Sequence, residues 1–354
     1  MKIGLILAAN IKLCPYVEIF KKVLDSNDIN YDVISWDRES LGEDEGIVFH
    51  YSARNTRNIL GKVIDYYKYA NFVKKEVLKS KYDKLIVFGG AIGVFMYGFL
   101  KKYYSGRFWF DFRDLSIEQK FMSRFKKMCD ISYCISISSQ GFKKVFPAQY
   151  DFVISHNFDI DIVRSVIGQH STFPMVDGPI IVSTIGQIRD YQANMQVVSA
   201  LQNLDDFSLN FIGRGIASKA LEYYVKKNKV QNVYFQGYYS KEEEADFYIQ
   251  SNFINIFQSR VRKEMTLMSN RFYLALIHRK PLIVTDGSTQ GEYVQKYKLG
   301  LSVVNCRDIS YKIRRYIDSF NEDEFISSCD KLLIDFASDY DNFYTNLLMF
   351  VRNV

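Results

Sequence analysis

The chain alternates short apolar runs with helix-length amphipathic segments through both of its halves. Such alternation is typical of parallel β-sheets that carry helices on both faces. The first half predicts strands at residues 3–8, 31–36, 85–88, 107–112, 131–136 and 152–155, with helices at 16–24, 58–78, 92–103, 117–128 and 139–145. The second half predicts strands at residues 179–185, 208–212, 232–235, 253–257, 281–285 and 301–304, with helices at 193–203, 216–228, 240–249, 264–278, 289–297, 308–319 and 322–350. We therefore expect an α/β protein with two Rossmann-like, doubly wound parallel sheets.

The stretch between the two halves, residues 159–178, holds no clear element and contains Gly168, Pro174 and Gly178. Glycine and proline interrupt regular structure, so we place the domain boundary there. We expect an N-terminal domain over residues 1–165, a C-terminal domain over 166–320, and a C-terminal helix over 321–354 that packs back on the N-terminal domain. A chain of 354 residues is long enough for two such domains. Two α/β domains that face each other imply a ligand-binding cleft between them.

Cysteine and histidine usage indicates a reducing compartment and no metal site. The five Cys and four His are scattered, with no C-x-x-C pair and no ligand spacing. We therefore expect no metal and no bound cofactor. The first residues enter a strand-like run at once, with no signal peptide. These features favour a cytoplasmic protein.

The longest uncharged stretch runs from Leu85 to Leu100 and contains three glycines. It is shorter than the roughly 18–20 residues that a membrane-spanning helix needs. We therefore expect a buried strand, a glycine turn and a helix in this stretch instead of a membrane span.

Three strands of the second half end in glycine turns, at Gly186, at Gly213 to Gly215, and at Gly237. The carboxyl ends of parallel strands meet at one edge of the sheet, where ligands bind in doubly wound folds. Glycine lets a phosphate approach the backbone amides at the start of a helix, and Arg189 is placed to add a charged contact. A single turn of this kind is weak evidence, whereas three in sequence favour a phosphate-binding edge.

A fourth segment, from Glu264 to Gly300, combines a helix-length apolar run, a short strand, a Gly-Ser-Thr turn and Glu292. It places small polar residues at the carboxyl end of another strand of the same sheet. Glu264 and Glu292 each have a plain structural reading, since acidic residues near a helix start favour the helix dipole or cap the helix. His278 we expect to be an ordinary helix-end residue.

These four segments, in this order and spacing, resemble the C-terminal domain of family-4-type glycosyltransferases of the two-Rossmann (GT-B) architecture. Two first-half segments, starting at Phe108 and Cys134, are similar to the acceptor domain of that family, and the segment from Phe152 resembles the stretch that leads into its linker. Bacterial enzymes that build capsular polysaccharide or exopolysaccharide are the most similar subgroup. The segment Asn270-Arg-Phe-Tyr273 resembles a variant of the family motif found in some capsule enzymes.

The resemblance implies transfer of a hexose from a nucleoside diphosphate sugar to a lipid-linked oligosaccharide acceptor, without a metal. Retention of configuration is favoured over inversion, because the leaving phosphate can then take the acceptor proton. Arg189 and Arg271 would neutralise the leaving diphosphate, Glu264 would hold hydroxyls of the donor sugar, and an inverting enzyme would use Asp114 as general base. The implied catalytic residues are Glu264, Asp114 and Arg113. The implied donor-binding residues are Gly186, Gln187, Arg189, Gly213, Arg214, Tyr238, Asn270, Arg271, Tyr273, Gly287, Ser288, Thr289 and Glu292.

The sequence departs from the family pattern at three positions. Gln187 and Gln192 replace the Arg and Lys that usually clasp the diphosphate, and Phe272 replaces the second of two paired Glu. These departures motivate an alternative, a catalytically weakened subunit that binds nucleotide sugar and assists a partner transferase. A nucleotide-sugar epimerase of the same shape is a third reading, but the sequence shows no acid–base pair for it.

Arg113 and Asp114 follow a buried-looking strand of the first half. Their place at a strand carboxyl end favours a role in binding acceptor or donor. The structural alternative is a salt bridge between adjacent opposite charges. Asp111 lies inside the strand pattern, and we expect it to be structural.

Positive charge is concentrated in the first half, where residues 54–107 hold 12 basic and 3 acidic residues. The long helix predicted at 58–78 interleaves lysines with aromatic residues. One reading is a patch that holds the protein at an anionic membrane, on the inner face of the plasma membrane, where a lipid-linked acceptor would lie. The commoner reading is a core-packed helix with a solvated lysine face. No nucleic-acid-binding module is recognisable, so we expect no nucleic-acid partner.

Overall fold

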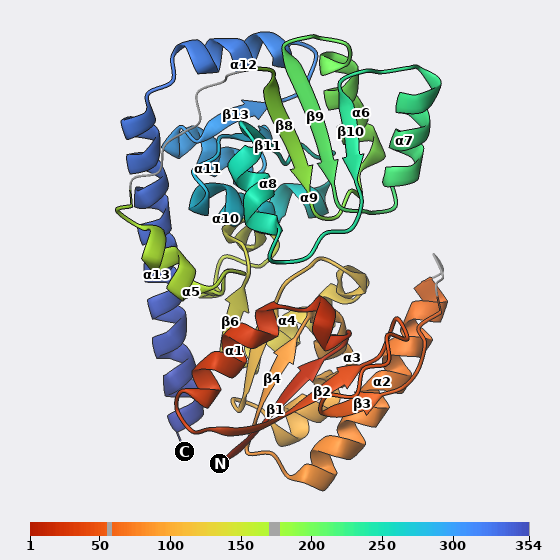
Figure 1. Ribbon diagram of the computed structural model, residues 1–354. Helices are drawn as coiled ribbons and strands as arrows, with labels where there is room; N and C mark the ends of the chain where they lie inside the picture. The colour runs from red at the N-terminus through yellow and green to blue at the C-terminus, as the bar shows by residue number, and fades with distance from the viewer. Residues whose placement is uncertain (55–58, 170–177, 354) are drawn as a thin grey trace. The chain divides into compact units, whose positions relative to one another are not determined.

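A computed structural model describes residues 1–54, 59–169 and 178–353. The chain divides into two compact units, each with its own sheet (Figure 1). Unit 1 comprises Met1–Asp159 and Ser338–Val354, and unit 2 comprises Ile160–Ala337. The division lies a few residues before the boundary predicted at 165/166, and the last helix belongs partly to each unit.

Unit 1 is built on a seven-stranded sheet in the order β3-β2-β1-β4-β5-β6-β7, and all of its pairs are parallel. The strands are β1 (Lys2–Leu7), β2 (Asn30–Trp36), β3 (Ile47–Phe49), β4 (Lys84–Phe88), β5 (Phe108–Phe112), β6 (Cys134–Ile137) and β7 (Val153–Ile154). The helices are η1 (Ile11–Leu13), α1 (Tyr16–Asp25), α2 (Ile59–Ser80), α3 (Gly90–Tyr103), η2 (Ile117–Phe121), α4 (Met122–Asp130) and η3 (Gln140–Lys144).

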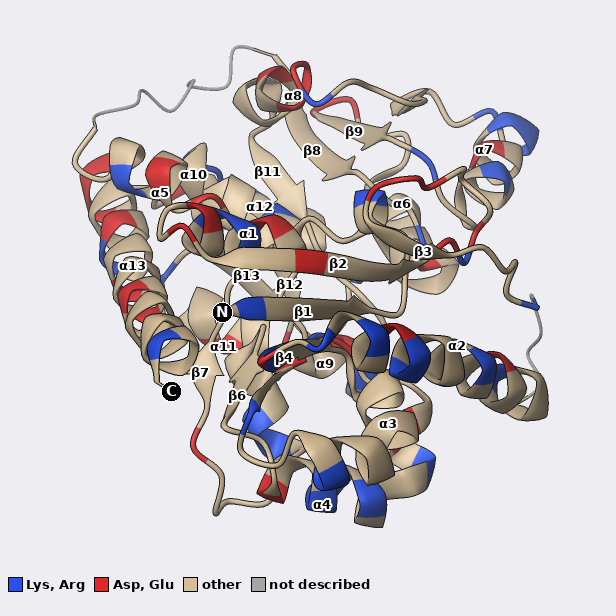
Figure 2. Cartoon of the chain, turned by 90° about the horizontal axis from the view of Figure 1, so that it is seen from below, with Lys and Arg blue, Asp and Glu red and all other residues tan. Residues whose placement is uncertain are grey.

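One face of the unit 1 sheet is covered by α1 and by the end of α13 (Glu322–Arg352). Phe20 of α1 and Phe343 of α13 make an edge-to-face contact, with ring centroids 4.9 Å apart, above the buried Trp109 of β5. The helices α2, α3 and α4 lie on the opposite face (Figure 2). Because helices bury both faces, the central strands are apolar on both sides, as parallel sheets require.

Unit 2 has a six-stranded parallel sheet in the order β10-β9-β8-β11-β12-β13. The strands are β8 (Ile180–Ile185), β9 (Phe207–Ile212), β10 (Val233–Gln236), β11 (Phe253–Asn255), β12 (Leu282–Thr285) and β13 (Gly300–Val303). The helices are α5 (Ile160–Val166), α6 (Tyr191–Leu201), α7 (Ser218–Lys227), α8 (Glu244–Gln250), α9 (Arg262–Thr266), α10 (Asn270–Ile277), α11 (Thr289–Tyr297), α12 (Ile309–Asp318) and the first part of α13.

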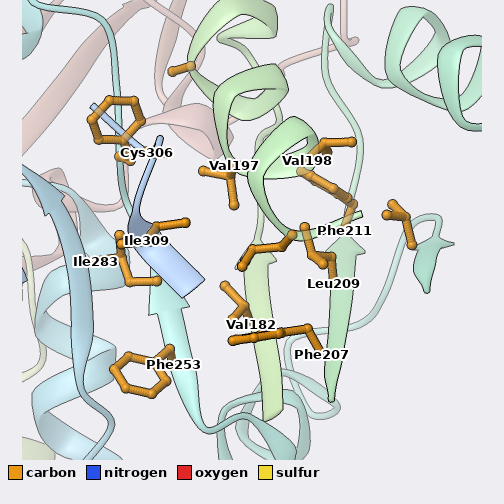
Figure 3. Close-up of a cluster of buried hydrophobic side chains, with 14 of the residues drawn as sticks. Val182, Val197, Val198, Phe207, Leu209, Phe211, Phe253, Ile283, Cys306 and Ile309 are labelled. Atoms are coloured by element: carbon orange, nitrogen blue, oxygen red, sulfur yellow. The ribbon is translucent and has the colours of Figure 1, made fainter. Parts of the chain in front are cut away.

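The core on one side of this sheet lies under α6, α7 and α12. Figure 3 shows Val197 and Val198 of α6 above Val182, Leu209 and Phe211 of the strands. The order of strands in both sheets reverses once, between β1 and β4 and between β8 and β11. The prediction of two doubly wound parallel sheets is confirmed.

The structure corrects three local predictions. It adds β3, an edge strand of three residues, and it forms α5 where the sequence showed no element. The helix expected at 264–278 is two helices, α9 and α10, because the Ser269 side chain caps α10 by accepting a hydrogen bond from the Arg271 amide. Part of the predicted boundary, residues 170–177, and the start of the helix predicted at 58–78 lie outside the described residues.

Candidate functional site

The three predicted glycine turns of unit 2 meet at the carboxyl edge of its sheet. The Gly186 amide donates to the Ile212 carbonyl at 2.7 Å, and the Gly213 amide donates to the Gln236 carbonyl at 2.8 Å. Gly186 and Gly213 have φ values of +88° and +111°, which only glycine adopts without strain. A Cβ on Gly213 would lie 2.2 Å from the Gly186 carbonyl oxygen, so the close approach of the two turns also requires glycine.

A cavity of about 800 Å³ opens on these turns. Its lining includes six of the residues that the resemblance implied for donor binding: Gly186, Gln187, Arg189, Gly213, Arg214 and Tyr238. Gly215, Ile216, Ser218, Lys219 and Tyr239 complete the lining. Three of these side chains are cationic and none is acidic. The cavity is therefore suited to an anionic ligand.

The cations come from different turns. Arg189 follows the Gly186 turn, and its Nε donates to the Gln187 side-chain oxygen. Arg214 lies between two glycines after β9, with its guanidinium 5.7 Å from the centroid of the Tyr238 ring. Lys219 lies in the first turn of α7, where the helix dipole also favours an anion. Arginine and lysine from separate elements thus surround one space.

Arg271 does not line this cavity but is tied to its rim. Its Nε donates to the Ile185 carbonyl and its Nη2 to the Gln187 carbonyl, on either side of Gly186. Burial lowers the pKa of Arg271, while Tyr248 and Tyr239 oppose that shift. An arginine remains charged at neutral pH even so. The guanidinium therefore places a fixed positive charge directly behind the Gly186 turn.

Asp190 joins this edge to the turn after β11. One carboxylate oxygen caps α6 by accepting from the Ala193 amide at 2.9 Å, and the other accepts from the Ser259 amide at 2.7 Å. Burial acts to raise the pKa of Asp190, but hydrogen bonds from Ser259 and Ala193 outweigh it, and the pKa is lowered. The carboxylate thus stays ionised and keeps the two turns in register.

A second group of implied donor residues gathers around the turn after β12. A Cβ on Gly287 would lie 3.8 Å from the terminal methyl of Met265, the residue next to Glu264. The Thr289 hydroxyl donates to the Met265 carbonyl at 3.2 Å, and the Ser288 hydroxyl accepts from the Gly291 amide at 3.0 Å. Ser288 and Thr289 are buried, so their side chains hold the turn together, whereas Gly287 is exposed.

The remaining implied donor residues lie on α10 and α11. Asn270 and Glu292 are exposed in the first turns of these helices, and Glu264 is half-buried in α9. Tyr273 is 2% exposed and packs on Phe336 at a centroid distance of 5.5 Å, in the core of unit 2. Phe272, at the position of the missing second Glu, is also fully buried.

In unit 1, Arg113 is bonded to Asp111, two residues before it in the sequence. Its Nε donates to the Asp111 carboxylate, and its Nη1 and Nη2 donate to the Ser155 carbonyl and hydroxyl at 2.8 and 2.6 Å. Its guanidinium lies 4.6 Å from the centroid of the Tyr16 ring. Asp114 is exposed. Arg113 is therefore part of a buried network with Asp111 and Ser155. The structural alternative from the sequence was a salt bridge with Asp114.

Sequence reasoning missed Lys219, Ser218, Ile216 and Tyr239 in the cavity lining. Ser218 and Lys219 had a signal, since the first turn of the helix after a glycine turn commonly holds phosphate. The structure adds one further indication of a binding site: Ile216 and Tyr238 are 89% and 87% exposed. Large apolar side chains exposed at the mouth of a cavity are typical of binding sites.

Within residues 1–54, 59–169 and 178–353, no group of three or more His, Cys, Asp and Glu side chains could hold a metal ion, and metal independence stays a prediction. Over the same residues, every helix is too short or too polar to cross a bilayer.

No protein-family model matches the sequence, and no curated protein matches it. Solved structures do resemble the fold. HepE from Anabaena, in complex with UDP, aligns over 100% of both chains with a TM-score of 0.70 and 12% identity. A glycosyltransferase from Rickettsia africae aligns over 100% of this chain and 99% of its own, with a TM-score of 0.68 and 13% identity. Sucrose-phosphate synthase from Thermosynechococcus elongatus aligns over 99% and 97%, with a TM-score of 0.67 and 13% identity. The two-sheet GT-B fold is thereby shown.

Proposed function

We propose that this chain is a glycosyltransferase that takes its sugar from a nucleoside diphosphate sugar. One observation carries the proposal. The glycine turns after β8, β9 and β10 form one cavity with Arg189, Arg214 and Lys219 and with no acidic side chain in its lining. Three cations from separate elements, one of them at the start of α7, surround there a space that fits a diphosphate. HepE, which is similar in fold, has been solved with UDP and with UDP-glucose, which supports a nucleotide donor.

The charge arrangement supports chemistry at the donor. Negative charge accumulates on the diphosphate as the bond to the sugar breaks, and fixed positive groups stabilise it. Arg271 is held in place before any ligand arrives, so its charge costs no reorganisation at that moment. With this charge supplied by side chains, we propose a transferase that needs no metal. Glu264, in α9, is proposed to hold hydroxyls of the donor sugar.

The finer proposals follow the resemblance in sequence. They are transfer of a hexose with retention of configuration to a lipid-linked oligosaccharide, and a role in capsular or other cell-surface polysaccharide. Retention needs no general base, because the leaving phosphate can take the acceptor proton, whereas inversion would use the exposed Asp114.

Nucleotide binding is the first test of this function. Thermal unfolding in the presence of UDP, GDP, dTDP or CMP compounds should reveal one ligand class that raises the melting temperature by several degrees. A ligand at 100 times its Kd stabilises the folded state by about 2.7 kcal/mol. Uridine is the control, because it lacks the diphosphate and should give a much smaller shift. If none of these compounds raises the melting temperature, the proposed function is wrong.

We also propose that unit 1 binds an anionic membrane surface through the basic region 54–107. Lys62, Lys68, Lys75 and Lys79 of α2 are exposed, and Tyr67 is 58% exposed among them. Figure 2 shows Lys and Arg positions, in blue, along α2, α3 and α4. Residues 55–58 of the region lie outside the described residues. Peripheral binding at the inner face of the plasma membrane would bring unit 1 to a lipid-linked acceptor.

The double substitution Lys62→Glu/Lys75→Glu should abolish binding to phosphatidylserine-containing vesicles in co-sedimentation. Each basic residue near such a surface contributes about 1 kcal/mol, so two reversals are expected to weaken binding at least 30-fold. The matched control is Lys226→Glu/Lys227→Glu on α7 of unit 2, which reverses two exposed charges elsewhere. Equal loss in both variants would indicate a general charge effect and contradict a membrane role for α2.

A second candidate function has one observation in its favour. Phe272 is buried where the family has its second paired Glu, and Gln187 is bonded to Arg189. A subunit that binds nucleotide sugar without transferring it, and assists a partner transferase, would have these features. Tight nucleotide binding with no turnover of any donor, in the presence of membrane extract, would favour this function over the first.

A further inference from the structure

Glu43 is a buried carboxylate in an otherwise exposed loop of unit 1. The loop connects β2 to β3 and follows the carboxyl end of β2. Glu43 is 1% exposed, whereas its neighbours Gly42 and Asp44 are exposed. No sequence pattern singles this residue out, since it is the first of three consecutive acidic residues, 43–45.

The conformation of the loop does not depend on the Glu43 carboxylate. Asp37 organises it by accepting hydrogen bonds from the Asn10 side chain at 2.6 Å and from the Leu41 and Gly42 amides at 2.8 and 3.2 Å. The Asn10 side-chain oxygen accepts from the Glu39 amide at 3.0 Å. The Asn10 hydrogen bond is the main reason that the pKa of Asp37 is lowered. The loop is thus held by Asp37 and Asn10.

The Glu43 side chain itself is poorly satisfied. Its Oε2 accepts one long hydrogen bond, from the Lys12 amide at 3.5 Å. Its Oε1 is buried and has no hydrogen-bond partner among the residues that the structure describes. Leaving a buried polar atom without a partner costs about 1–3 kcal/mol, and more for a charged group. Such an atom calls for an explanation, and a ligand that supplies the missing donor is one.

The place of Glu43 in the fold fits a ligand site. The Lys12 amide, in η1 after β1, donates to Glu43, after β2, at 3.5 Å, and the guanidinium of Arg113, after β5, lies 4.6 Å from the centroid of the ring of Tyr16, which follows η1. These groups therefore gather at the carboxyl edge of the unit 1 sheet. In doubly wound sheets ligands bind at that edge, near the point where the strand order reverses. Here the reversal lies between β1 and β4.

We propose that Glu43 Oε1 accepts a hydrogen bond from a hydroxyl group of the acceptor sugar, and that Glu43 is thus a specificity-determining residue of the acceptor site. This assignment rests on the proposed function. An ionised carboxylate only accepts hydrogen bonds, so its partner must be a donor. A sugar hydroxyl is such a donor. A cationic group is disfavoured, because the Arg113 guanidinium shares this edge of the sheet.

The test compares Glu43→Gln with Glu39→Gln, the same chemical change at an exposed position of the same loop. The amide can place an N–H group where the acceptor hydroxyl needs an oxygen. Transfer is measured with membrane extract as acceptor source and the nucleotide sugar that the wild-type protein uses. A hydrogen bond to a charged group contributes about 1.5–3 kcal/mol. We therefore expect Glu43→Gln to lower kcat/KM for the acceptor roughly 10- to 100-fold.

Two further readouts separate acceptor binding from a structural effect. The UDP-induced shift in melting temperature and the slow hydrolysis of donor without acceptor should be the same in Glu43→Gln as in the wild type. Glu39→Gln should be unchanged in all three measurements. Glu43→Asp, which keeps the charge but withdraws it by one methylene, should lose less transfer than Glu43→Gln and serves if the amide variant does not fold.

Normal transfer by both Glu43 variants, with normal UDP binding, would overturn the assignment of Glu43 alone. Equal losses of transfer, donor hydrolysis and UDP binding would show that Glu43 is merely structural and would also overturn it. By contrast, a wild-type protein that neither binds UDP compounds nor transfers sugar would contradict the proposed function, and the Glu43 assignment with it.

Discussion

Replacing Arg271 with alanine is expected to weaken binding of the nucleoside diphosphate about 100-fold and to lower the rate of sugar transfer by at least that factor. Removing one preorganised donor to a developing charge costs roughly 2.7–4 kcal/mol in well-studied sites. Arg271 also holds the Ile185 and Gln187 carbonyls on both sides of Gly186. Its loss would therefore remove a charge and loosen the turn that binds phosphate.

The measurement is nucleotide affinity by isothermal titration or thermal shift, with transfer assayed in parallel. Arg315→Ala is the matched control, since Arg315 is an exposed arginine of α12 in the same unit. Arg271→Lys should recover part of the affinity, because it restores the charge but not the two hydrogen bonds that the guanidinium donates to the carbonyls. If Arg271→Ala folds normally and binds the nucleotide as tightly as Arg315→Ala, the Arg271 charge does not contribute to diphosphate binding.

The fold was predictable because its signal is local and repeated. Each central strand is an apolar run and each crossover helix follows at the expected distance, so even the uncharged stretch 85–100 resolved correctly into β4, a turn and α3. The errors lie where that signal is short. β3 has three half-buried residues, and the break between α9 and α10 depends on Ser269, whose amide also donates to the Gln290 side chain at 3.0 Å. Gln290 lies 21 residues after Ser269, beyond the range of the local pattern that predicts a helix.

The glycine turns of the site were predictable because backbone conformation dictates the residue there, and Gln187, Arg189, Arg214 and Tyr238 were named with them. The turns at Gly186 and Gly213 were recognisable because a positive φ and a close approach both require glycine. Side chains brought in from elsewhere, such as Lys219 and Tyr239, were missed because their place depends on the tertiary fold. The partner of Arg113, however, could have been predicted from the sequence. Residues two apart on a strand share a face, so the pairing of Asp111 with Arg113 follows from the strand geometry.

Replacing Arg113 with alanine is expected to destabilise unit 1 by about 3–5 kcal/mol, because it leaves the Asp111 carboxylate buried without its charge partner. Asp111 is fully buried, and it also accepts a hydrogen bond from the Ser136 hydroxyl. That hydroxyl in turn accepts from the Trp109 indole at 2.7 Å. Loss of the arginine would thus leave the buried Asp111 carboxylate without a cationic partner in the centre of the sheet. Denaturant unfolding measures the effect, with the exposed Arg124→Ala on α4 as control.

The destabilisation should depend on pH. Burial raises the pKa of Asp111, and Arg113 opposes that rise, so the pKa should rise further in the alanine variant. The folded variant then keeps a proton that the unfolded chain releases above its ordinary pKa of about 3.9. Folding takes up protons in that range, so the free energy of unfolding falls as pH increases. We expect a small difference from the wild type near pH 4 and the full difference near pH 8.

A second substitution separates the charge from the packing. Asp111→Asn removes the charge that needs Arg113, so the double variant Asp111→Asn/Arg113→Ala should be more stable than Arg113→Ala alone at pH 8 and should lose the pH dependence. If Arg113→Ala leaves stability unchanged at every pH yet abolishes transfer, Arg113 acts on the substrate and the buried ion pair is incidental. If instead stability falls and the refolded protein still binds UDP in unit 2, the arginine is a structural residue, and Asp114 and Glu43 remain the carboxylates of unit 1 to test against the acceptor.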